Sequence, residues 1–91
     1  MTKYERHAEL CKLLNETYLK KNQAYGDAFG DTFREFGVTS AIVRMSDKWN
    51  RIKALIKGAK NEVLDESVKD TLLDLSNYCL MTIIEMEQEV K

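Results

Sequence analysis

The sequence predicts an all-α fold, and three observations support this. The 91 residues contain no proline, residues that favour helices are abundant, and apolar residues recur every three or four positions. We expect a single domain over residues 1–91 with three long helices, at about 2–22, 40–57 and 66–89. We expect a loop rich in glycine and aromatic residues between the first two helices. The helices are predicted to pack as an oligomeric helical bundle.

The first helix is indicated by one apolar stripe, made by Tyr4, His7, Leu10, Cys11, Leu14 and Tyr18. From Tyr25 to Gly37 this periodicity ends, and three glycines stand among four aromatic residues. We interpret the segment as an ordered loop with room for one short helical turn, around Thr32 to Phe36.

The second helix has Thr39 or Ser40 as its expected N-cap and Gly58 at its end. Its predicted core face contains Ala41, Met45, Trp49, Ile52 and Ile56. We therefore expect Trp49 to be a packing residue.

The third helix is expected to start after Asp65 as N-cap and to end near Glu89. One apolar stripe contains Val68, Leu72, Leu75, Cys79, Ile83 and Met86, and a second contains Leu73, Leu80 and Ile84. Because a helix that is apolar on two sides must be covered on two sides, we predict self-association with this helix at or near the interface. A short helix from the loop would be an alternative cover.

Composition excludes several classes of protein. Fourteen basic and fifteen acidic side chains give a formal net charge of −1, which argues against nucleic-acid binding through bulk charge. No apolar run approaches the ~20 residues that cross a bilayer, and the N-terminus does not resemble a signal peptide, so we expect a cytoplasmic protein without membrane contact. Cys11 and Cys79 are expected to be buried free thiols.

Two charged rows of opposite sign are predicted on neighbouring helices. The third helix carries an acidic row and the second a basic row: Glu66, Asp70, Asp74 and Asn77 on the former, and Arg44, Lys48 and Arg51 on the latter. In one interpretation the rows only form interhelical salt bridges. In the other, Glu66, Asp70 and Asp74 hold Mg²⁺ while the basic row binds a polyphosphate.

A further candidate lies where the first helix ends, at Lys21, Asn22, Tyr25, Gly26 and Asp27. The lysine could meet a phosphate, the glycine lets the backbone approach a ligand, and the tyrosine could stack on a base. The alternative is a helix-breaking turn with Tyr25 and Phe29 packed inward.

Three separated segments resemble a known family. Residues 21–29 (KNQAYGDAF), 36–51 (FGVTS leading into RMSDKWNR) and 65–78 (DESVKDTLLDLSNY) are similar to small phage and bacterial proteins termed nucleotide modification associated domain 1. The third-helix segment also resembles all-α nucleoside triphosphate pyrophosphohydrolases, whose helices carry paired carboxylates that hold Mg²⁺. This chain departs from that pattern, because its second helix offers Arg44, Asp47, Lys48 and Arg51, and because Glu66 and Asp70 are four residues apart rather than three.

Three functions follow as hypotheses. The first is a phage-type nucleotide-binding protein that acts as a Mg²⁺-dependent pyrophosphohydrolase, with Glu66, Asp70 and Asp74 as its candidate catalytic residues. The second is a non-catalytic binder that sequesters a nucleotide signal against a host defence. The third is a structural or regulatory helical module that binds another protein.

Overall fold

The computed structural model describes residues 1–58 and 61–89, and for 61–66 and 89 the backbone alone. Within these ranges the chain forms four helices and no strand: α1 (Lys3–Tyr25), α2 (Ala28–Phe36), α3 (Val38–Gly58) and α4 (Asn61–Glu89). The predicted all-α class is confirmed. No helix among the described residues combines the length and apolar character that crossing a membrane requires.

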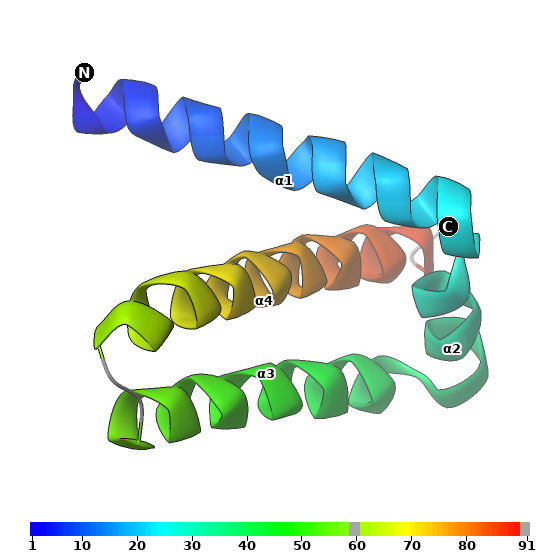
Figure 1. The fold of residues 1–91 in the computed structure, drawn as a ribbon. Coiled ribbons are helices and arrows are strands. Elements are labelled where there is room, and N and C mark those ends of the chain that lie inside the picture. The colour runs from blue at the N-terminus through cyan, green and yellow to red at the C-terminus, as the bar shows by residue number, and fades with distance from the viewer. Residues whose placement is uncertain (59–60, 90–91) are drawn as a thin grey trace.

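The helices α3 and α4 form an antiparallel hairpin, and this pair has the most extensive packing in the molecule (Figure 1). The helix α1 lies along the other edge of α4 and diverges from it toward the N-terminus. The short helix α2 packs on α3 and α4 at the end of the hairpin where α1 terminates. The C-terminal end of α1, the whole of α2 and the middle of the hairpin therefore surround one corner of the molecule.

The core of this corner is small. Phe29 and Phe33 of α2 and Ala41 of α3 are buried together, with Met45, Tyr78 and Met81 packed against them. Because α2 supplies both phenylalanines, this short helix is what joins the end of α1 to the hairpin.

The segment predicted as a loop is mostly helical, which corrects its interpretation. The predicted turn at Thr32–Phe36 is the second half of α2, which begins at Ala28. Gly26 (φ 70°) and Gly37 (φ 77°) stand on either side of it with positive φ, a conformation that side chains disfavour. The glycines therefore mark the two ends of a helix instead of the interior of a loop.

Three predicted helix ends were displaced. The helix α1 continues to Tyr25, α3 starts at Val38, and α4 starts at Asn61. Ser40 thus lies inside the first turn of α3 rather than at its N-cap, and its hydroxyl donates to the Gly37 carbonyl at 2.8 Å. Asp65 is an internal helical position. The prediction that Gly58 ends α3 falls at the edge of the described residues, because Gly58 is helical and residues 59–60 lie outside them.

Several residues predicted to be buried are exposed. No residue of α1 is buried, because this helix has little packing against α4 and diverges from it toward the N-terminus (Figure 1). Trp49 has 52% of its surface exposed, and both Cys11 and Cys79 are exposed free thiols. Periodicity identified apolar faces correctly, but the described residues do not supply an element to cover each of them.

Candidate functional site

A cavity of ≈290 Å³ opens at the corner where all four helices meet. It is lined by Tyr18, Lys21, Asn22, Tyr25, Gly26, Asp27, Ala28, Phe29, Arg44, Lys48, Asp74, Asn77, Tyr78 and Met81. The last two turns of α1 supply one wall, and the turn at Gly26 returns the chain to α2. Arg44 and Lys48, one turn apart on α3, face Asp74, Asn77, Tyr78 and Met81, which share one side of α4.

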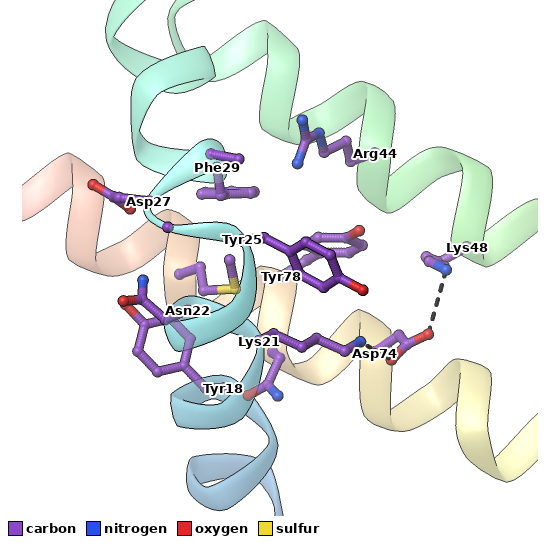
Figure 2. A pocket seen from close by; sticks show the side chains of 14 residues that line it. Tyr18, Lys21, Asn22, Tyr25, Asp27, Phe29, Arg44, Lys48, Asp74 and Tyr78 are labelled. Atoms are coloured by element: carbon purple, nitrogen blue, oxygen red, sulfur yellow. Dashed lines mark hydrogen bonds and ion pairs between the residues drawn. The ribbon is translucent and has the colours of Figure 1, made fainter.

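Two lysines from different helices meet at one carboxylate on the cavity wall. Lys21 Nζ lies 3.4 Å from Asp74 Oδ1, and Lys48 Nζ lies 3.3 Å from Asp74 Oδ2. Figure 2 shows the two ammonium groups approaching Asp74 from α1 and α3. Because Asp74 carries a single negative charge, it compensates only one of the two lysines.

Arg44 is the third cation of the cavity, and no carboxylate among the described side chains is paired with it. The residue is half-buried. Its guanidinium lies 5.6 Å from the centre of the Phe29 ring and 3.5 Å from the Thr32 hydroxyl. A partly desolvated guanidinium without a carboxylate partner is a preferred site for an anion.

Aromatic rings form the second chemical component of the cavity. Phe29 and Tyr78 are stacked, with ring centroids 5.8 Å apart and planes inclined by 20°, and Lys48 Nζ lies 6.0 Å from the centre of the Tyr78 ring. Tyr25 lines the cavity but has 78% of its surface exposed. The interpretation with both Tyr25 and Phe29 packed inward thus holds for Phe29 alone.

Two amides complete the wall formed by α1 and α4. The side-chain amide of Asn77 donates to the Leu14 carbonyl at 3.1 Å, which fixes its orientation and links α4 to α1. Asn22 is half-buried and lines the same cavity. Both amides offer donors and acceptors to a polar ligand.

The negative charge of Asp27 is partly offset by a neighbouring arginine. Its carboxylate is paired with Arg34 at 3.3 Å, and in Figure 2 its side chain points away from the lysines. Arg34 also pairs with Asp31 and with Glu85. Hydrogen bonds, first to Asp31 and then to Asp27, raise the pKa of the Arg34 guanidinium above its ordinary value.

Most of the predicted binding residues come together here. Eight of them line the cavity with Asp74: Lys21, Asn22, Tyr25, Gly26, Asp27, Arg44, Lys48 and Asn77. Arg51 is not among the lining residues and is exposed on α3. Asp70 lines a neighbouring cavity of ≈380 Å³ between α1 and α4, together with Asp74 and Asn77. The side chain of Glu66 lies outside the described residues.

The cavity also contains residues that sequence analysis did not select. These are Tyr18, Ala28, Phe29, Tyr78 and Met81. Tyr78 and Met81 follow Asp74 at four and seven positions, so helical spacing alone could have identified them. Phe29 could not be identified in this way, because its segment was interpreted as a loop.

Of the three predicted magnesium ligands, Asp70 and Asp74 line the same cavity, and the side chain of Glu66 lies outside the described residues. No three His, Cys, Asp or Glu side chains within the described part of the chain are close enough together to hold a metal ion. Both oxygens of Asp74 accept from ammonium groups, so a cation at Asp74 would first have to displace Lys21 and Lys48. The magnesium site stays a prediction.

Comparison with known proteins gives one finding. No curated protein and no solved structure matches the chain significantly. The family described as nucleotide modification associated domain 1 matches residues 21–86, a range that includes every lining residue of the cavity except Tyr18. The chain therefore belongs to the nucleotide modification associated domain 1 family.

Proposed function

We propose that this protein binds a nucleotide or a nucleotide-like anion in the cavity, with its phosphates on Lys21, Arg44 and Lys48. The observation that carries the proposal is the charge surplus. Three cations face the cavity, while Asp27 is paired outside it with Arg34. Two carboxylates, Asp27 and Asp74, also line the cavity, so three cations against two anions leave a surplus of one positive charge.

The aromatic residues support a ligand that has a planar ring as well as a charge. Tyr25 lies at the exposed edge of the cavity, next to the stacked pair of Phe29 and Tyr78. Stacking of a base on an aromatic ring contributes about 1–3 kcal/mol. The volume of ≈290 Å³ is at the lower end of the range of roughly 300–1,000 Å³ for small-molecule sites, which favours a mononucleotide over a larger ligand.

The decisive experiment is calorimetric titration of the protein with nucleoside mono-, di- and triphosphates and with a free nucleoside. We expect binding of phosphorylated ligands and weaker binding of the nucleoside. Arg44→Ala should weaken binding roughly 10- to 100-fold, because a hydrogen bond to a charged group contributes about 1.5–3 kcal/mol.

Arg51→Ala is the matched control, because it removes the same group from the same helix at an exposed position that does not line the cavity. Its affinity should equal that of the unmodified protein. Equal losses in both variants would mean that the α3 arginines act through overall charge. An absence of binding across the panel would refute the proposal and favour the structural or regulatory module.

Mg²⁺-dependent release of pyrophosphate is a second candidate function. It is favoured by Asp70 and Asp74, which both line the neighbouring cavity between α1 and α4. Triphosphate binding at the lysines would free Asp74 to act as a Mg²⁺ ligand. Incubation with Mg²⁺ and deoxynucleoside triphosphates should then yield monophosphate, and Asp70→Asn should abolish it. Recovery of intact ligand after heat denaturation would instead indicate sequestration.

A further inference from the structure

A bare apolar surface lies on the side of the α3–α4 hairpin away from the cavity. Two rows of side chains form it, each with the seven-residue spacing that places residues on one helix face. We call it the back face, and its rows are Ile42, Trp49 and Ile56 on α3, and Leu72, Cys79 and Met86 on α4. The five members other than Cys79 each expose between 45% and 59% of their surface, and Cys79 is exposed as well.

The two rows are adjacent. Cys79 Sγ lies 3.7 Å from Met45 Sδ, and Met45 stands between Ile42 and Trp49 on α3. The contact between Lys48 and Asp74 lies on the opposite side of the hairpin, where the cavity opens. The two rows therefore meet at Met45, which also packs against the core that Phe29 and Phe33 of α2 form, while Ile42 and Trp49 on either side of it stay exposed.

The total exposed area is larger than that of a compact monomer of the same mass. The chain exposes 7099 Å², whereas a compact monomer of 10.6 kDa exposes about 5,500 Å². The excess is about 1,600 Å², part of which belongs to the diverging end of α1 (Figure 1). A standard interface covers about 800 Å² on each partner, so the excess is large enough for one.

We propose that a second copy of this chain covers the back face, with the two α4 helices antiparallel and related by a twofold axis near Cys79. In that arrangement Leu72 of each copy lies opposite Met86 of the other, so apolar meets apolar. Lys69 and Glu87 are exposed on α4 at almost equal distances on either side of Cys79. The antiparallel arrangement brings these opposite charges together, whereas a parallel one would bring like charges together.

This interface leaves both cavities open, because each lies on the outer side of its own hairpin. The dimer is thus independent of the proposed nucleotide binding, and either idea can fail without the other. It also accounts for the exposure of Trp49, which has no cover among the described residues.

Chemical cross-linking tests the axis directly. In a Cys11→Ser protein, whose remaining cysteine is Cys79, a short bis-maleimide should join two chains in high yield. A Cys79→Ser protein that retains Cys11 is the control and should give little cross-linked product. Light scattering after size exclusion should give twice the mass of 10.6 kDa.

Two sets of variants test the surface and its register. Ile83→Glu, one turn from Cys79, should shift the protein to monomer, whereas Leu19→Glu should not, since Leu19 is an equally exposed apolar residue on α1. Leu72→Lys and Met86→Glu should each weaken the dimer at least tenfold, and the double variant should restore it by pairing the new charges.

The proposal fails if the unmodified protein is a monomer up to high micromolar concentration. It also fails if a dimer forms that is not cross-linked through Cys79 and is insensitive to Ile83→Glu. The cross-linking result stands on its own should a charged variant not fold.

Discussion

Phe33 carries more of the core than any other described side chain, with only 1% of its surface exposed. Replacing it with alanine leaves a cavity between α2 and the hairpin. We expect Phe33→Ala to lower the free energy of unfolding by about 3–5 kcal/mol, measured by urea denaturation. Phe36→Ala is the control on the same helix, because Phe36 is 65% exposed and its loss should change stability by less than about 0.5 kcal/mol. Similar losses of stability in the two variants would contradict the burial of Phe33 in the core.

Asp74 is the residue whose role separates simple binding from metal chemistry. If it only balances Lys21 and Lys48, Asp74→Asn removes one negative charge from the cavity. This change should tighten nucleotide binding roughly 3- to 10-fold. If it holds Mg²⁺, the same change should weaken binding of triphosphates whenever Mg²⁺ is present. Titrations with and without Mg²⁺ distinguish the two roles by the sign of the change.

Among the elements, α2 depends on the backbone conformation at its ends. Gly37 has φ 77° and ψ −169°, a region that is almost restricted to glycine and costs other residues about 1–3 kcal/mol. Gly37→Ala should therefore lower the free energy of unfolding by that amount, although its new Cβ would meet open space. Gly58→Ala also meets open space but lies in helical conformation, so it should raise stability by about 0.4–1 kcal/mol. A denaturation series on the two variants tests whether the signs differ.

The start of α1 should respond to pH. Thr2 and Glu5 form a capping box, in which the Thr2 N–H donates to Glu5 Oε1 at 3.1 Å and the Glu5 N–H donates to the Thr2 hydroxyl at 3.0 Å. The first of these bonds, helped by the Thr2 side chain, lowers the pKa of Glu5 below its ordinary value of 4.5. A depressed folded pKa means that the cap stabilises the helix above pH 4.5 and is lost as the pH falls through the lower, folded value.

Amide exchange or chemical shifts of the first turn of α1, followed as the pH is lowered below 4.5, would measure this loss. Glu5→Gln should remove most of the pH dependence of that turn. If the first turn of α1 were lost over the same pH range in Glu5→Gln, a group other than Glu5 would be responsible.

For the whole molecule, the small core and the exposed back face together predict that folding and association are linked. Ligands and partners that bind only the folded state stabilise it by mass action. The midpoint of thermal unfolding should therefore rise with protein concentration, and this rise should disappear in Ile83→Glu. A midpoint that is independent of concentration in the unmodified protein would contradict the dimer.

An element of the fold could be predicted from the sequence where neighbouring residues determine it, and could not where contacts between distant residues do. The three long helices follow from local properties: the absence of proline, the apolar spacing, and glycines that break the periodicity. Residues 28–36 were interpreted as part of a loop with one short helical turn, because the apolar periodicity ends there. The helix forms nevertheless, since burial of Phe29 and Phe33 against α3 and α4 stabilises it.

The same distinction between local and long-range interactions applies to the candidate site. The sequence by itself determined that Arg44 and Lys48 share one face of a helix, as Asp74 and Asn77 do, because helical periodicity is a property of the chain. Only the tertiary structure decided that the end of α1 joins them, that Lys21 and Lys48 share Asp74, and that Arg51 is left outside. Those outcomes depend on how α1 packs along α4, which no local spacing encodes.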